Sequence, residues 1–236
     1  MRPASETNES PQAFWLKNLG HANGYNRWVF EQTNAHLGRK VLEVGCGTGT
    51  FTSLLAASGR HVVALDIEPD FVAETRRATA DMPNVEARVG DIMTEALPAE
   101  FDSIFMLDVL EHIEDDLKIL QMLKSSLISG GQIVLKVPAF PSLYGPMDQS
   151  IGHFRRYSKR SLEQVLLKAG FASSQFWYFN CAGMLGWWLN GKLLQRQTPP
   201  ASQVELFERV LPLVRAVDFF ARPFAGLSIF AVARAP

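Results

Sequence analysis

Short runs of apolar, often β-branched residues alternate along the chain with segments whose apolar residues recur every three or four positions. The runs are typical of buried strands, and the longer spacing is typical of helices that cover a sheet. The expected strands are residues 41–44, 61–65, 85–89, 101–107, 132–137, 171–179 and 227–233. The expected helices are residues 50–58, 70–80 and 158–169, with a further leucine stripe at Leu117, Leu120, Leu123 and Leu127 that Gly130 and Gly131 should end. This alternation predicts an α/β, Rossmann-like fold, in which a mostly parallel seven-stranded sheet carries helices on both faces.

The pattern also predicts helical lid elements in two segments, one before the first strand and one before the last. We expect an N-terminal helical cap in residues 1–38, a Rossmann-like core in 39–180, a helical insertion in 181–222 and the last strand in 223–236. Together they fit one domain of 236 residues. Residues 169–191 hold no charged side chain, but their polar residues and glycines favour a strand followed by a helix over a membrane span.

Composition limits the class of partner. The chain has 23 Lys and Arg against 24 Asp and Glu, a net charge of −1, so no global field attracts nucleic acid or an anionic membrane. The two cysteines, Cys46 and Cys181, favour a reducing compartment. Residues 1–10 are polar and lack the apolar core of a signal peptide, which favours a cytoplasmic location. No metal site is expected.

A glycine-rich turn follows the first expected strand. Gly45, Gly47 and Gly49 lie between that strand and the next helix, where glycines let the backbone approach a ligand closely. Glu43 precedes them, and an acid there suits a ligand with positive charge better than the pyrophosphate of a dinucleotide. Asp66 ends the next strand, where a carboxylate can accept hydrogen bonds from ribose hydroxyls.

These segments, with Gly-Asp-Ile at 90–92 and FDSIFMLDVLEH at 101–112, resemble the class I S-adenosylmethionine-dependent methyltransferases, in particular the small-molecule branch with a Val-Leu-Glu-His element. The resemblance covers roughly residues 39–170. It implies S-adenosylmethionine as cofactor and S-adenosylhomocysteine as product. It also implies that Asp66 binds the ribose and that Asp91 reaches the adenine amino group beside Ile92. A helix around residues 25–28 is similar to one that closes over the cofactor in this family, and packing of Tyr25 and Trp28 in the core explains these residues equally well. The implied cofactor-binding residues are Glu43, Gly45, Cys46, Gly47, Gly49, Asp66, Ile67, Asp91, Ile92, Leu107, Asp108, Tyr25 and Arg27.

The acceptor side of the site has two candidate segments. Methyl transfer to a hydroxyl needs a base, and His112 follows the fourth strand, although local hydrogen bonding or a cofactor contact explains it better. The second segment, residues 144–157, is a long loop rich in Tyr, His and Arg that should lie over the sheet edge. There we expect His153 to act as base or to orient the substrate, with Asp148 compensating the local positive charge. The catalytic candidates are His153, Asp148 and His112, and the substrate-binding candidates are Tyr144, Arg155, Arg156 and Tyr157.

The leading hypothesis is methylation of a small molecule, such as a secondary metabolite, at a hydroxyl or enol oxygen on an apolar skeleton. Methylation at nitrogen or carbon shares the same cofactor motifs and stays open, as does a lipid or quinone O-methyltransferase at the membrane surface. A non-catalytic cofactor-binding module is the alternative from another class. Near-neutral charge, and Leu-Asp-Val-Leu at 107–110, argue against a nucleic-acid substrate. We expect a monomer or homodimer without a membrane span, whose apolar insertion is a lid, a dimer face or a peripheral membrane contact.

Overall fold

Seven strands form one sheet in the computed structural model, which describes residues 22–95, 97–198 and 200–236. They are β1 (Lys40–Val44), β2 (His61–Asp66), β3 (Val85–Val89), β4 (Phe101–Leu107), β5 (Leu127–Pro138), β6 (Ser173–Phe179) and β7 (Ser228–Arg234). The order across the sheet is β3-β2-β1-β4-β5-β7-β6. Only β7, among these described strands, runs antiparallel to its neighbours β5 and β6. The prediction of a mostly parallel seven-stranded sheet is therefore confirmed.

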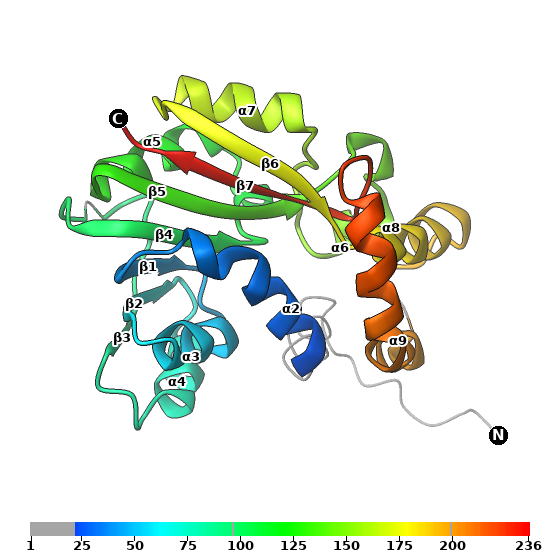
Figure 1. Cartoon of the computed structure of the whole chain (residues 1–236), viewed down its shortest axis with the longest axis horizontal. Coiled ribbons are helices and arrows are strands. Elements are labelled where there is room, and N and C mark those ends of the chain that lie inside the picture. Colours follow the sequence, from blue (N-terminus) through cyan, green and yellow to red (C-terminus); the bar gives the residue numbers. More distant parts are fainter. Residues whose placement is uncertain (1–21, 96, 199) are drawn as a thin grey trace.

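Helices cover both faces of this sheet, as the sequence pattern predicted (Figure 1). The helices α2 (Asn23–Thr33), α3 (Thr50–Ala57) and α4 (Pro69–Ala78) lie on one face, and α5 (Asp116–Ser126) and α7 (Lys159–Lys168) lie on the other. Alternate side chains of a strand point to opposite faces, so β4 serves both layers. Its Phe105 packs with the α3 and α4 side chains, while Ile104 and Met106 pack beneath α5 and α7.

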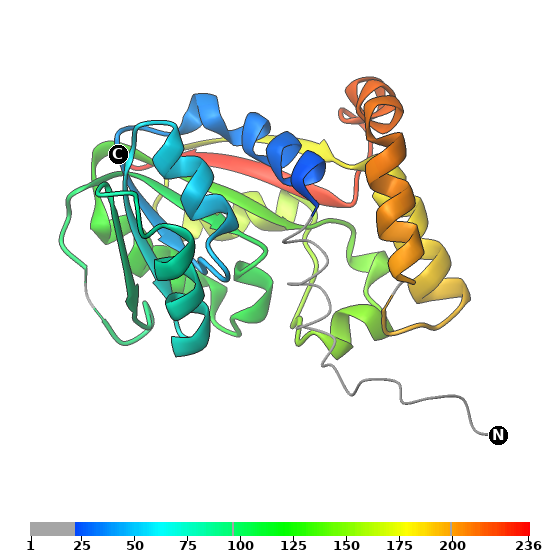
Figure 2. The same cartoon turned by 90° about the horizontal axis from the view of Figure 1, so that it is seen from below.

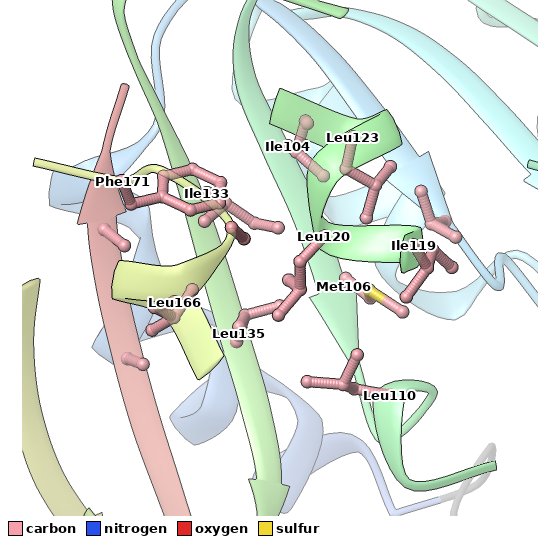
Figure 3. Close-up of a cluster of buried hydrophobic side chains, with 14 of the residues drawn as sticks. Ile104, Met106, Leu110, Ile119, Leu120, Leu123, Ile133, Leu135, Leu166 and Phe171 are labelled. Atoms are coloured by element: carbon pink, nitrogen blue, oxygen red, sulfur yellow. The ribbon is translucent and has the colours of Figure 1, made fainter. Parts of the chain in front are cut away.

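The larger hydrophobic core lies between the sheet and α5 and α7 (Figure 3). Ile119, Leu120 and Leu123 of α5 are fully buried against the strands, at the three-to-four spacing that the leucine stripe showed in the sequence. Asp115 caps this helix, since its side chain accepts a hydrogen bond from the Lys118 N–H. The core thus fixes the ends of β4 and β5, from which the candidate catalytic side chains extend.

One boundary differs from the prediction. Helix α5 ends at Ser126, before Gly130 and Gly131, and β5 begins at Leu127. Leu127 continues the helical periodicity, but it pairs with Phe101 of β4, so a long-range strand contact overrides the local pattern. Gly130, at a φ of +73°, lies inside the strand that the sequence analysis placed after it.

The remaining helical elements gather beyond the carboxyl ends of the parallel strands. They are η2 (Leu110–His112), η3 (Pro141–Leu143), α6 (Pro146–Ser150), α8 (Cys181–Trp187), the π-helical segment η4 (Trp188–Leu193) and α9 (Ala201–Ala221), and η1 (Asn34–His36) follows α2. Figures 1 and 2 show α6, α8 and α9 at this end of the sheet, with α2 reaching toward α9. The long loop after the fifth strand therefore contains a turn of helix at each of two places.

Helices α2 and α9 meet in a small separate core. Trp28 of α2 packs with Leu211 and Val214 of α9 and with Phe179 at the end of β6. The Trp28 and Phe179 ring centroids are 4.2 Å apart. Glu208 of α9 also accepts hydrogen bonds from two backbone N–H groups at the start of α2. The predicted cap and the predicted insertion therefore hold each other. The part of the predicted cap before residue 22 lies outside the described residues.

Segment 169–191 forms β6 and α8, as the sequence analysis expected. None of the helices in the described parts of the chain combines the length and apolar character needed to cross a bilayer.

Candidate active site

The glycine-rich turn connects β1 to α3 at the carboxyl edge of the sheet. Gly45 and Gly49 have φ angles of +80° and +83°, which side chains rarely tolerate. A Cβ atom on Gly45 would lie 2.4 Å from Cγ2 of Val109, and one on Gly49 would lie 2.9 Å from the Thr75 backbone. Glycine is therefore required at both positions, because the turn is packed against its neighbours as tightly as a ligand cradle demands.

Glu43 is buried beneath this turn. Its carboxylate accepts a 2.5 Å hydrogen bond from the hydroxyl of Thr52 in α3. Burial raises the pKa of Glu43 to about 8, although the Thr52 hydrogen bond opposes the shift. A carboxylate held at this cost in free energy is poised to ionise when a cation lies nearby.

Asp66 and Asp91 extend from the ends of β2 and β3, at the same edge. Asp66 accepts hydrogen bonds from the backbone N–H groups of Gly47 (2.9 Å) and Glu68 (3.0 Å), so it holds the glycine turn from the side. Asp91 accepts one from the N–H of Met93. Both carboxylates are half-buried and keep lone pairs that these bonds do not use.

The two isoleucines that follow these acids differ in exposure. Ile67, after Asp66, is 64% exposed, whereas Ile92 is 6% exposed and packs in the larger core. The side chain of Cys46 also points into the core, where burial raises the pKa of its thiol to about 12. The Cys46 thiol contacts the Gly47 carbonyl and the Thr75 hydroxyl, so it packs the turn against α4.

Asp108 and Lys136 form an ion pair at the ends of β4 and β5. Asp108 has a φ of +52°, and its half-exposed carboxylate receives the ammonium group of the buried Lys136. Burial alone would lower the pKa of Lys136, but Asp108 and Tyr25 overcome it and raise the pKa. The Tyr25 hydroxyl of α2 lies within hydrogen-bonding reach of Lys136 and Asn180, and burial raises the pKa of Tyr25. This contact joins the cap helix to the sheet edge.

Asp148 is the centre of a buried hydrogen-bond network in the loop after β5. Its Oδ1 atom lies 2.9 Å from Nδ1 of His153 and accepts a 2.7 Å bond from Nε of Arg156, and its Oδ2 accepts the N–H of Gly145. Burial would raise the pKa of Asp148, but the His153 hydrogen bond and the Arg156 charge hold it below its usual value. A carboxylate at Nδ1 leaves Nε2 of His153 as the proton acceptor.

Nε2 of His153 faces Glu111 and His112. It lies 3.7 Å from Oε1 of Glu111, beyond hydrogen-bond length, and the His112 and His153 ring centroids are 4.6 Å apart. Burial and the neighbouring His153 lower the pKa of His112 to about 4, so His112 is neutral at physiological pH. Burial raises the pKa of Glu111 well above its usual value. Neither carboxylate oxygen of Glu111 has a hydrogen-bond partner in the described part of the chain.

One set of side chains has the composition of a metal site. Ligand atoms of Glu111, His112 and His153 lie within 4.8 Å of one another, a grouping that the sequence analysis did not expect. The charge of Arg156 also acts on Glu111 and would oppose a second cation there.

Two of the predicted substrate-binding residues lie away from the cluster of Glu111, His112 and His153. Arg155 donates to the carbonyls of Ile113 and Glu114 and lies 3.1 Å from Asp116, and Tyr157 donates its hydroxyl to the same Asp116. Both therefore brace the start of α5. Arg156 is buried between Asp148 and the ring of Trp187, with its guanidinium 4.6 Å from the ring centroid.

Three further candidates have simple placements. Tyr144 donates its hydroxyl to the carbonyl of His153 and so fixes the backbone of that residue. Leu107 is half-buried between the two smaller cores. Arg27 is exposed on α2.

Sequence reasoning did not single out Lys136, Thr52, Asn180 or Glu208. A lysine inside the apolar run 133–137 was the available signal for Lys136, because a buried charge needs a partner. Asn180 caps α8, since its side chain accepts the N–H of Gly183, so its residue type before a helix was the available signal. Thr52 bonds Glu43 across the glycine turn, nine positions away. Glu208 has no local signal, because its partners lie in α2, 183 and 184 positions away.

Comparison with known proteins agrees with this geometry. A family described as a methyltransferase domain matches residues 13–175 of the chain. An uncharacterized 37.1 kDa protein in transposon TN4556 of Streptomyces fradiae is 32% identical over 170 residues, which cover 64% of this chain and 48% of that protein. The mitochondrial ubiquinone biosynthesis O-methyltransferase of Schizosaccharomyces pombe is 30% identical over 111 residues, which cover 45% of this chain and 40% of that protein.

The fold has close counterparts among solved structures. An S-adenosylmethionine-dependent methyltransferase from Mesorhizobium loti superposes with a TM-score of 0.63 at 18% identity, covering 90% of this chain and 99% of that one. The chain spans about half the length, or less, of the curated relatives described above. With its strand order, its glycine turn and the family match over most of its length, the chain belongs to the class I S-adenosylmethionine-dependent methyltransferases.

Proposed function

We propose that this chain transfers a methyl group from S-adenosylmethionine to a hydroxyl or enol oxygen of a small molecule with an apolar skeleton. The observation that carries the proposal is the His153–Asp148 pair, in which Asp148 holds Nδ1 and leaves Nε2 as the atom that can accept a proton. The resemblance to ubiquinone biosynthesis O-methyltransferases, which act on oxygen by their name, supports the choice of atom.

The residues at the glycine turn fit the cofactor. S-adenosylmethionine supplies an electrophilic methyl group on a sulfonium and carries a cationic amino group. Glu43 beneath the turn provides the opposing negative charge, and Gly45 and Gly49 keep the turn packed against Val109 and Thr75, where side chains would clash. Asp66 and Asp91, at successive strand ends, are placed to accept hydrogen bonds from the ribose and the adenine.

On the acceptor side, the chain has to position an oxygen and take its proton. His153 takes that proton at Nε2, and Asp148 stabilises the resulting imidazolium through Nδ1. The His153 hydrogen bond and the Arg156 charge hold the pKa of Asp148 below its usual value, so Asp148 stays ionised beside Nδ1. Asp108 and Lys136, between this pair and α2, add polar groups that orient the reactants.

Cofactor binding is tested with Asp66→Ala. We expect the cofactor Kd, measured by titration calorimetry, to rise at least tenfold, because the variant loses both its ribose contact and the brace on Gly47, and one charge-assisted hydrogen bond is worth about 1.5–3 kcal/mol. Asp81→Ala, at an exposed acid between α4 and β3, is the matched control and should bind normally. If the wild-type protein bound neither S-adenosylmethionine nor S-adenosylhomocysteine, the proposed methyl transfer would be wrong and the chain would be a non-catalytic protein with this fold.

The acceptor atom is tested with labelled S-adenosylmethionine and paired acceptors. Catechols and quinols with and without isoprenoid tails would be compared with the matching aromatic amines. Label is expected on oxygen, with higher kcat/KM for the tailed compounds. Transfer to the amines alone would replace the oxygen proposal by an N-methyltransferase.

The cover over the cofactor is tested with Glu208→Gln. Glu208 of α9 accepts the N–H groups of Gly24 (3.1 Å) and Tyr25 (2.9 Å), and so holds the start of α2. Losing a charged cap costs about 1 kcal/mol, so the cofactor Kd should rise about fivefold if α2 closes over the ligand. Glu205→Gln, which changes an exposed glutamate on the same helix, is the control. If both variants bound the cofactor with wild-type affinity, α2 would not contribute to cofactor binding.

A further inference from the structure

Helix α9 has two apolar faces, and the described residues cover only one of them. Leu211 and Val214 are buried against α2 and β6. On the other face, apolar residues recur every three or four positions and stay exposed; they are Leu206, Val210, Leu213, Val217, Phe220 and, just past the helix, Phe224. Phe220 is 75% exposed and Phe224 79% exposed. Burying such rings stabilises a protein by about 1.5–3 kcal/mol each, so this face is suited to a contact outside the chain.

The exposed face continues onto α8 and η4, which lie beside α9 (Figure 2). Leu185, Trp188, Leu189 and Leu193 are all at least 40% exposed there. Most of the exposed large apolar side chains of the described residues fall between Leu185 and Phe224. An apolar groove of about 440 Å³ opens in the same surface, lined by Phe140, Met184, Trp188 and Phe224 among others. We call this surface, on α8, η4 and α9, the apolar face.

Positive charge surrounds the apolar face. Lys192, Arg196, Arg209 and Arg222 are exposed in these segments. Two of the three acids there are engaged elsewhere, since Asp218 is buried at the N–H of Cys181 and Glu208 holds α2. Only Glu205, of the acids between residues 181 and 226, is fully exposed. The local charge is thus positive although the whole chain is at −1.

This combination selects the occupant. In a symmetric dimer the same patch lies on both copies, so the four cations of each copy would approach those of the other with only Glu205 exposed to oppose them. An anionic lipid surface instead accepts Leu, Phe and Trp at the headgroup boundary, while Lys and Arg extend to the phosphates. We propose that the apolar face docks the protein onto an anionic lipid bilayer as a peripheral contact. The groove beside Phe140, a residue between the end of β5 and the start of η3, would then open at the lipid surface.

The proposal is independent of the methyl acceptor, and it is tested by binding alone. The full chain would be floated with vesicles of phosphatidylcholine, and with vesicles that also contain phosphatidylglycerol. We expect binding to the mixed vesicles that weakens with added salt, and much weaker binding to phosphatidylcholine alone. Phe220→Ser with Phe224→Ser should lower vesicle affinity more than tenfold, since two rings no longer enter the boundary.

Controls separate this contact from folding and dimerisation. Leu167→Ser changes a 54% exposed leucine on α7, away from the apolar face, and should bind as the wild type does. Arg209→Gln with Arg222→Gln should weaken binding to anionic vesicles about tenfold or more and leave phosphatidylcholine binding unchanged. Wild-type protein that does not float, or a double Phe variant that floats as well as Leu167→Ser, would overturn the proposal. So would a wild-type dimer, seen by light scattering, that the Phe substitutions dissociate.

Discussion

Replacing His153 with glutamine is expected to lower kcat by about a hundredfold or more while the cofactor Kd stays within about twofold of the wild-type value, since a general base contributes about 10²–10⁴ in rate. Asp148 holds Nδ1 of His153, which leaves Nε2 to take the acceptor proton in the proposed reaction. Glutamine at this position keeps a donor for Asp148, and Arg156 continues to neutralise that carboxylate. The loss should therefore appear in turnover, measured with labelled cofactor, and not in the melting temperature.

The matched control is His61→Gln, which changes an exposed imidazole at the start of β2. It should leave both kcat and the cofactor Kd unchanged. If His153→Gln retained turnover within threefold of the wild type, an amine acceptor that needs no base would fit better. If cofactor affinity and melting temperature fell together with turnover, His153 would be a packing residue of the loop.

Replacing Glu43 with glutamine is expected to stabilise the fold and weaken the cofactor site at the same time. The pKa of Glu43 is about 8 in the folded chain against an ordinary 4.5, because the carboxyl is buried. Between these values the folded state keeps a proton that the unfolded state releases, so this group makes stability fall as pH rises. Each pKa unit corresponds to about 1.4 kcal/mol, which amounts to about 3 kcal/mol near pH 7.

Glutamine removes this penalty and still accepts the Thr52 hydroxyl. Allowing about 1 kcal/mol for its additional buried N–H donors, we expect a gain of about 2 kcal/mol, or roughly 5 °C in Tm. The gain should grow as the pH is raised toward about 8, because that is the range in which wild-type Glu43 loses stability. Thermal unfolding at several pH values checks this, with the exposed Glu163→Gln of α7 as the control.

The cofactor should respond in the opposite sense. A cationic ligand favours ionised Glu43, so the wild-type Kd should fall as the pH rises toward about 8 and level off above it. Glutamine carries no charge, and its Kd should be at least tenfold higher with little dependence on pH. A Glu43→Gln protein that binds S-adenosylmethionine normally, or that is less stable than the wild type above neutral pH, would contradict this account of the buried carboxyl.

The strands and their edge were predictable from local pattern. β3 (Val85–Val89) and β4 (Phe101–Leu107) have the expected boundaries, and β7 is shifted by one residue, because short buried runs bounded by polar or turn residues have few alternatives. Glu43, Asp66 and Asp91 could be assigned to one edge for a similar reason, since parallel strands bring their carboxyl ends together. Local pattern failed at Leu127, where pairing with Phe101 outweighs helical periodicity.

The candidate chemistry divides in the same way. His153 and Asp148 could be chosen as candidates from the sequence, because they lie in a long loop rich in Tyr, His and Arg after the fifth strand. Their 2.9 Å contact, and the engagement of Arg155 by the start of α5, depend on how that loop folds over the sheet. Glu208 was unremarkable in sequence, because its partners in α2 lie 184 and 183 positions away.

The sequence by itself therefore determined the sheet, the glycine turn and the acids at the strand ends, because periodicity and chain direction act over a few residues. The tertiary structure alone decided which side chains meet. It buried Glu43 and so raised its pKa to about 8, it paired His153 with Asp148 instead of solvent, and it covered one apolar face of α9 while leaving the other exposed. Burial and long-range contacts set these outcomes, and they depend on the whole packed chain.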